Sequence, residues 1–84
     1  MTRLETRIQK LYESPRSVSS DELISILVSL GFELRGKKTR HGVYRHPKLP
    51  HIRLVIPDQN PLKEVYVKKV RGVIEELREL EDDG

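Results

Sequence analysis

Hydrophobic residues recur at helical spacing in three parts of the chain. Near the start, Leu4, Ile8 and Leu11 lie at i, i+4 and i+7, which predicts a short helix over about residues 2–13. An isolated helix of this length is only marginally stable in water, so its hydrophobic face should pack on the domain or on a partner. Residues 14–17 read as a linker, because a proline disfavours helical structure at the residue before it.

The second hydrophobic stripe has signals at both of its ends. The stretch LISILVSL predicts a helix over residues 20–30. Ser19 and Glu22 have the spacing of a capping box, in which the hydroxyl accepts from the Glu22 amide while the carboxylate reaches back. Gly31 occupies the position at which a residue in the left-handed conformation commonly ends a helix.

Three short extended segments follow the second helix. Phe32–Arg35 and Ile52–Ile56 alternate hydrophobic and polar residues, and Val43–His46 is rich in residues that favour strands. Gly36–Lys38 is expected to turn the chain between the first two strands, and Pro47–Pro50 should end the second. Connections this short favour an antiparallel meander.

A final helix is expected over about residues 61–80. Hydrophobic residues from Val70 to Leu77 recur at i, i+3, i+4 and i+7. Asn60 and Pro61 have the character of a helix start, with Asn as the cap and Pro at the first helical position.

The predicted order is therefore α-α-β-β-β-α in a single domain spanning residues 1–84. We expect an α+β fold in which the helices pack on one face of a three-stranded antiparallel sheet. Without the N-terminal helix, the order becomes α-β-β-β-α, which is that of double-stranded-RNA-binding domains. Element order alone is weak evidence for function.

Composition excludes several classes of protein. The chain has no cysteine, which rules out disulfides and thiolate metal sites. Its hydrophobic runs are far shorter than the roughly 20 residues that span a bilayer, and the first residues lack the hydrophobic core of a signal peptide. We therefore expect a cytoplasmic protein that does not contact membranes.

The net charge of +3 is unevenly distributed along the chain. Between Leu34 and Ile56 there are seven Lys or Arg and all three His, with no Asp or Glu, whereas residues 75–83 contain six acidic residues and one Arg. A basic surface of this size can neutralise several phosphates and gain from counterion release. It can also serve solubility alone, but the complete lack of acids favours a nucleic-acid or acidic partner.

The three histidines are not spaced as metal ligands, and no cysteine or nearby carboxylate completes a tetrahedral set, so no metal or cofactor is expected. RNA cleavage needs no metal if a base removes the 2′-hydroxyl proton, and histidine suits that role because its ordinary pKa lies near physiological pH. On chemistry alone, His41 and His46 are both candidates, and His51 is disfavoured.

Strand alternation places His41 and Arg45 on one side of the sheet and Tyr44 and His46 on the other. If Tyr44 packs under the helices, His41 and Arg45 share the open face.

Two of the three tyrosines, Tyr44 and Tyr66, are expected to pack in the core or on the sheet rather than to stack on bases. Signatures of other enzymes, such as a glycine-rich phosphate loop or a nucleophile elbow, are absent from the sequence.

The stretch DELISILVSLGF, followed by GKKTRHGVYRHP and IRLVIP, resembles the HicA family of small mRNA-cleaving toxins over about residues 19–80. The resemblance places the family's catalytic histidine on His41, and matches His46-Pro47 to the segment that ends the second strand. The family's Gly and Ser before that histidine fall on Thr39 and Arg40, where this chain departs from the pattern.

The resemblance implies a metal-independent endoribonuclease in which His41 acts as general base or acid. It also implies a HicB-like antitoxin partner that covers the basic face. The helix over 2–13 lies outside the family core and is expected to pack on the domain or to form a homo-oligomer or antitoxin contact. The cations expected to bind RNA phosphates are Lys37, Lys38, Arg40, Arg45 and Arg53.

Two alternatives stay open on the sequence. One is a catalytically inactive RNA-binding module of the same fold, in which Thr39 and Arg40 mark lost chemistry. The other is a protein-interaction adaptor whose basic face binds an acidic partner.

Overall fold

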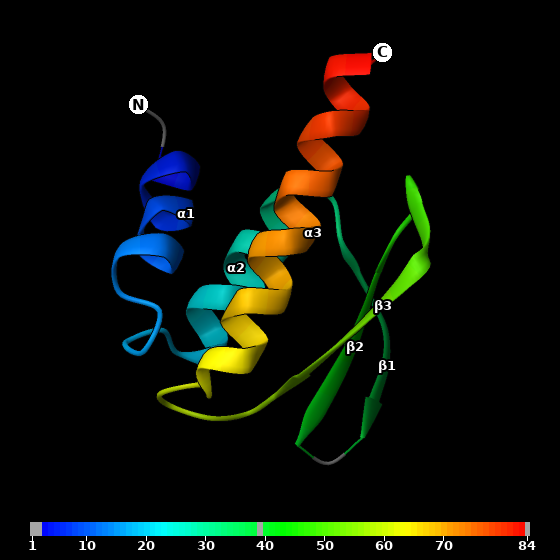
Figure 1. The fold of residues 1–84 in the computed structure, drawn as a ribbon. Helices are drawn as coiled ribbons and strands as arrows, with labels where there is room; N and C mark the ends of the chain where they lie inside the picture. Colours follow the sequence, from blue (N-terminus) through cyan, green and yellow to red (C-terminus); the bar gives the residue numbers. More distant parts are fainter. Residues whose placement is uncertain (1–2, 39, 84) are drawn as a thin grey trace.

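The computed structural model describes residues 3–38 and 40–83. Helices α1 and α2 precede a three-stranded sheet, and helix α3 follows it; in Figure 1 all three helices lie on one side of the sheet. The predicted α+β class and the double-stranded-RNA-binding-domain-like order after α1 are confirmed. The elements are α1 (Arg3–Glu13), α2 (Ser20–Ser29), β1 (Glu33–Lys38), β2 (His41–His46), β3 (Leu49–Pro57) and α3 (Glu64–Asp83).

The sheet is an antiparallel meander with β2 at its centre, as predicted. The turn expected at Gly36–Lys38 was wrong, because these residues pair with β2 and Lys38 lies opposite His41. The register shifts between Leu34 and Gly36, and this bulge accommodates Arg35 as an extra residue. Strand β1 therefore carries its lysines along β2 to the level of His41.

The connection between β2 and β3 is shorter than the predicted break at Pro47–Pro50. The turn contains Pro47 and Lys48, and Leu49 is already a fully buried residue of β3. Pro50 is tolerated because β3 is an edge strand and because its register with β2 is irregular there, so the missing N–H breaks no regular ladder.

Both predicted ends of α2 are confirmed. The Ser19 hydroxyl accepts a hydrogen bond from the Glu22 backbone N–H at 3.2 Å. The Glu22 carboxylate binds Lys10 Nζ of α1 at 2.7 Å, so in place of the reach back to the cap that the capping box predicts, this first-turn acid joins the two helices. Gly31 has φ +99°, which is the left-handed conformation expected of the stop.

The predicted start of α3 at Pro61 was wrong, since the helix begins at Glu64. Asn60 and Pro61 lie in a bend, and Leu62 follows in an extended connection. The Leu62 backbone N–H donates to Val18 O at 2.8 Å, and its side chain is buried. This segment is held against the connection between α1 and α2, so the helical ladder starts only after it.

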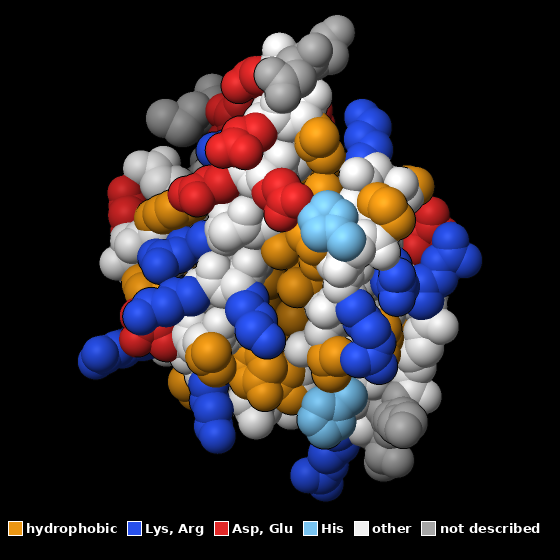
Figure 2. Space-filling model, turned by 45° about the vertical axis from the view of Figure 1, so that its right-hand side comes forward, with side chains coloured by type: hydrophobic (Ala, Val, Ile, Leu, Met, Phe, Trp, Pro, Cys, Tyr) orange, Lys and Arg blue, Asp and Glu red, His pale blue; other side chains and the backbone are white. Residues whose placement is uncertain are grey.

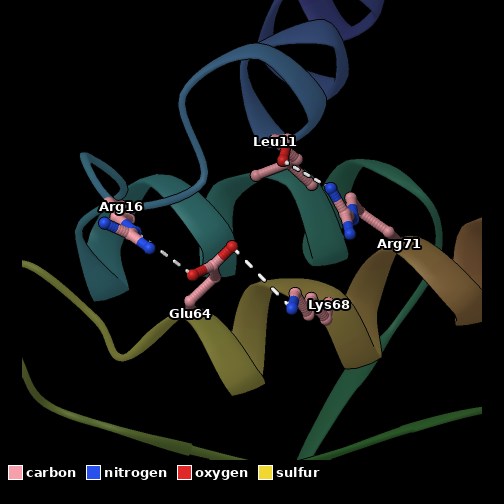
Figure 3. Close-up of polar contacts among 5 residues, drawn as sticks. All are labelled: Leu11, Arg16, Glu64, Lys68 and Arg71. Carbon is pink, nitrogen blue, oxygen red and sulfur yellow. Dashed lines mark hydrogen bonds and ion pairs between the residues drawn. The ribbon is translucent and has the colours of Figure 1, made fainter.

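Helix α1 contributes its hydrophobic face to the core. Ile8 and Leu11 are buried, and Leu4 packs against the same cluster. Figure 3 shows the polar contacts at this junction: Arg71 Nη1 reaches Leu11 O at 3.5 Å, and Arg16 Nε lies 3.3 Å from Glu64 Oε2. In the part of the chain described, no helix combines the length and hydrophobicity needed to cross a membrane.

Candidate functional site

The two faces of β2 differ as alternation predicted. Tyr44 and His46 are buried beneath the helices, at 6% and 7% exposed. His41 and Arg45 are exposed on the other face, which no helix covers. The sequence therefore identified which of the strand's side chains can meet a ligand.

His46 is fixed within the fold through both of its ring nitrogens. Its Nδ1 accepts the Lys48 backbone N–H at 3.0 Å, so Nε2 is the protonated nitrogen and donates to Leu30 O at 2.9 Å. The ring also meets Phe32 edge-on, with centroids 5.0 Å apart. Because both nitrogens are engaged and the ring is buried, His46 joins the end of α2 to the sheet and has no free position for proton transfer to a ligand.

His41 begins β2, where it lies opposite Lys38 of β1 and Pro57 of β3. Its side chain is exposed and lines three separate depressions. We name them the open-face groove, on the uncovered side of the sheet; the α2 pocket, between the sheet and the start of α2; and the α3–β3 groove, along the edge of the sheet. His41 is thus the point at which the three meet.

The open-face groove is wide and basic, with a volume of about 690 Å³. Arg45 is held in place by a hydrogen bond from Nη2 to Pro50 O at 2.8 Å, and Arg35 pairs with Glu33 at 3.1 Å. Within residues 3–38 and 40–83, Lys37 and Arg53 form no ion pair. The side chains that line the groove with charge or a titratable ring are Arg35, Lys37, His41, Arg45 and Arg53.

One of the predicted cations, Arg40, lines the α2 pocket instead of the open-face groove. Arg40 lies in the turn between β1 and β2, where its carbonyl accepts the Asp58 N–H at 2.7 Å, and it lines the α2 pocket beside His41. The backbone of Lys38 belongs to β1, and its side chain is not among those that the structure describes. Thr39, where the sequence departs from the family pattern, lies outside the described residues.

The α2 pocket encloses about 230 Å³ on the helix side of His41. Tyr44 forms part of its wall, and a Cβ on Gly42 would lie 2.8 Å from Tyr44 Cε2, so the glycine leaves room for the ring along the strand. Burial raises the pKa of the Tyr44 hydroxyl, which therefore stays protonated at neutral pH. Asp21 and Asp58 also line the pocket, although the sequence around His41 contains no acid.

The α3–β3 groove is lined by residues that were not predicted from the sequence to belong to the site. Tyr66 packs against the core, as predicted, but it also lines this groove together with Lys69, next to His41 and Arg53. The available signal was helical spacing, because Tyr66 and Lys69 are three residues apart on α3 and so lie on one face. Their neighbours on β3 could be identified only from the tertiary structure.

Among the described residues, no group of three or more His, Cys, Asp or Glu is placed to hold a metal ion. His51, which the sequence disfavoured, lies away from the site and its Nε2 is 2.6 Å from Glu76 Oε1 of α3.

Comparison with known families gives one match. A family model described as HicA toxin of bacterial toxin–antitoxin matches residues 20–80, a range that begins at α2 and includes the whole sheet and most of α3. No curated protein and no solved structure matches the chain. Since the match covers well over half of the chain, this protein belongs to the HicA toxin family of bacterial toxin–antitoxin pairs.

Proposed function

We propose that this toxin is an endoribonuclease that cleaves mRNA without a metal ion, with His41 as its catalytic residue. The observation that carries the proposal is the position of His41: an exposed imidazole at the junction of three depressions, two of which, the open-face groove and the α3–β3 groove, have Lys or Arg and no acid among their described lining residues. Phosphate binding and proton transfer would therefore take place at the same point.

The reaction needs one proton acceptor and a cationic environment. In the neutral form, His41 takes the proton from a ribose 2′-hydroxyl, and the 2′-oxygen attacks the adjacent phosphorus. The bond from phosphorus to the 5′-oxygen breaks, and the leaving oxygen takes a proton from water. The products are a 2′,3′-cyclic phosphate and a 5′-hydroxyl. Positive side chains around the phosphate stabilise the charge that builds on it in the transition state.

The cations of the groove have distinct positions in this proposal. Arg45, held by its bond to Pro50, and Arg53 bind the RNA backbone on the open face. Lys37 stands at the edge between the open-face groove and the α2 pocket, and Arg40 approaches His41 from the pocket side. Lys38 stays a proposed phosphate ligand: its backbone lies opposite His41 in the ladder, and its side chain is not among those described.

A toxin of this family is paired with an antitoxin, and we propose that a HicB-like antitoxin covers the open-face groove and His41 with an acidic surface. The proposed substrate places the activity in the cytoplasm, where mRNA is translated. A homo-oligomer through α1 would have to use a side of that helix away from Ile8 and Leu11, because these two residues already pack within the chain.

The test compares wild type with His41→Ala for cleavage of mRNA in the presence of EDTA. General acid–base catalysis typically contributes 10²–10⁴-fold, so we expect the variant to lose about that factor. His51→Gln serves as the matched control, since it removes another exposed histidine outside the grooves and should leave cleavage unchanged. Equal cleavage by wild type and His41→Ala would remove His41 from the mechanism, and full inhibition by EDTA would remove the metal-independent reaction.

One observation favours a second candidate, an RNA-binding module that no longer cleaves. Arg40 stands beside His41 where the family pattern has a small residue. In that case wild type binds RNA in a salt-dependent way without cleaving it, and Thr39→Gly with Arg40→Ser restores cleavage. Lack of RNA binding at low salt, together with tight binding to an acidic protein, would instead identify an adaptor.

A further inference from the structure

Strand β3, at the edge of the sheet, runs beside α3. Side chains of the two elements are in contact at one end, the closed end, and a groove separates them at the other, the open end. At the closed end, His51 of β3 meets Glu76 of α3 at 2.6 Å. At the open end, the α3–β3 groove leads to His41 and has a volume of about 430 Å³. Figure 2 looks onto this side of the molecule and shows hydrophobic side chains at the bottom of a hollow, with Lys and Arg on both sides.

The open end combines an aromatic ring, a hydrophobic floor and positive charge. Tyr66 is partly exposed on α3, and Leu54 and Ile56 lie below it on β3. Lys69 and Arg53 stand on the two sides, and the groove lining contains no acid. An aromatic platform flanked by cations is the arrangement by which proteins hold single-stranded nucleic acid, since every base has a face that can stack.

The groove is continuous with the proposed reaction centre through shared residues. His41 and Arg53 line both the α3–β3 groove and the open-face groove. An RNA strand whose cleaved phosphodiester lies at His41 can therefore place one neighbouring nucleotide on the open face and the other at the sheet edge.

We propose that the α3–β3 groove binds the nucleotide next to the cleaved phosphodiester, with its base stacked on Tyr66 and its phosphate bound by Lys69. This inference rests on the proposed function and adds to it a substrate class: single-stranded RNA that passes around the edge of the sheet. A base in a duplex is paired and stacked within its own helix, so it cannot lie flat on Tyr66.

The experiment measures binding of a single-stranded oligoribonucleotide that carries a fluorescent base analogue, in a His41→Ala background so that the RNA stays intact. Tyr66→Leu keeps a hydrophobic side chain against the core but removes the ring. We expect it to weaken binding about tenfold and to abolish the quenching of the base analogue. Tyr66→Phe keeps the ring and should bind within about twofold of the parent.

Lys69→Ala is the second variant, and it cannot act by unfolding the domain because Lys69 is exposed. It should make the negative slope of log affinity against log salt shallower by about 0.7, the contribution of one phosphate contact on a single strand. Lys68→Ala is its matched control. Lys68 is the residue before Lys69 on α3, is exposed and does not line the groove, and its Nζ lies 3.9 Å from Glu64 Oε1 (Figure 3). The control should leave the slope unchanged.

Unchanged RNA binding by both Tyr66→Leu and Lys69→Ala would overturn the inference, and lost antitoxin binding by the same variants would show that the groove receives a protein. Equal losses for single-stranded and duplex RNA would overturn it as well. The outcome is separable from that of the proposed function, because binding is measured without cleavage. If wild type fails to cleave but Tyr66 still contributes to binding, the groove stands and the nuclease proposal falls.

Discussion

The two ends of β2 carry the same residue type in opposite circumstances. His41 is exposed at the first position of the strand and lines three depressions. His46, at the last position, is buried, and both of its ring nitrogens are bonded to backbone atoms. The five-residue separation puts them on opposite faces of the sheet, because side chains alternate along a strand.

The difference shows how one strand divides stability from function. At the His46 end, the two ring nitrogens form hydrogen bonds with a backbone carbonyl at the end of α2 and with a backbone N–H in the turn into β3. The residue should therefore contribute to the stability of the fold. At the His41 end, the side chain is exposed, so the residue is available for chemistry. Substitutions at the two ends should therefore change different measurements.

The largest expected change in the free energy of unfolding is the one caused by His46→Ala. The substitution leaves Leu30 O and the Lys48 N–H without their partners and removes the ring that contacts Phe32. We expect the free energy of unfolding to fall by about 3 kcal/mol. Urea denaturation followed by circular dichroism measures this.

The matched variant at the other end of the strand is His41→Ala, whose free energy of unfolding should stay within about 0.5 kcal/mol of wild type, as is usual for an exposed residue. If the two variants lost similar stability, the contrast between the two ends would be wrong.

The next effect is that of Gly31→Ala, at the point where α2 meets His46. Gly31 has φ +99°, and a Cβ there would lie 3.0 Å from His46 Nε2. The left-handed conformation alone costs a residue with a side chain about 1–2 kcal/mol, and displacement of the imidazole weakens its bond to Leu30 O. We expect a loss of about 2 kcal/mol by the same denaturation assay.

Gly72→Ala is the control for glycine replacement as such. Gly72 lies inside α3, and a Cβ there meets no atom within 4 Å. Alanine favours the helix, so this variant should be more stable by about 0.5–1 kcal/mol. A destabilised Gly72→Ala would mean that the space on this side of α3 is more restricted than its geometry shows.

The two faces of β2 and the two ends of α2 could be predicted from the sequence, because the alternation of side chains and the spacing of capping residues are local properties. Alternation separated Tyr44 and His46 from His41 and Arg45, and the cap at Ser19 and the stop at Gly31 delimited α2. Each of these predictions depends on residues within one element, where the backbone geometry itself fixes which side chains share a face.

The features that the sequence did not predict depend on contacts between distant elements. The turn expected at Gly36–Lys38 is replaced by paired strand, and α3 begins at Glu64 because Leu62 is held by Val18, 44 positions earlier in the chain. The involvement of Tyr66 in a groove with His41 likewise follows from the packing of α3 beside β3. No periodic pattern encodes such pairings.

The smallest of the expected losses of stability, after those of His46→Ala and Gly31→Ala, is that of Gly42→Ala, which also links the two kinds of measurement. A Cβ there would lie 2.8 Å from Tyr44 Cε2 and 3.3 Å from Leu34 Cδ1, so the tyrosine ring must shift. The ring can turn toward the α2 pocket, which limits the cost to about 1 kcal/mol. His41 and Tyr44 line the same pocket, so the displaced ring should also lower RNA cleavage.

Gly36→Ala separates the loss of stability from the replacement of a strand glycine as such: among the described residues the atom nearest to its Cβ would be Val43 Cβ, at an ordinary 3.9 Å, so its stability should be nearly unchanged. Lower cleavage in Gly42→Ala with unchanged RNA affinity would mean that Tyr44 positions the reacting groups near His41. Unchanged cleavage despite the shifted ring would mean that the α2 pocket takes no part in the reaction, which would leave the open-face groove and the α3–β3 groove as the path of the RNA past His41.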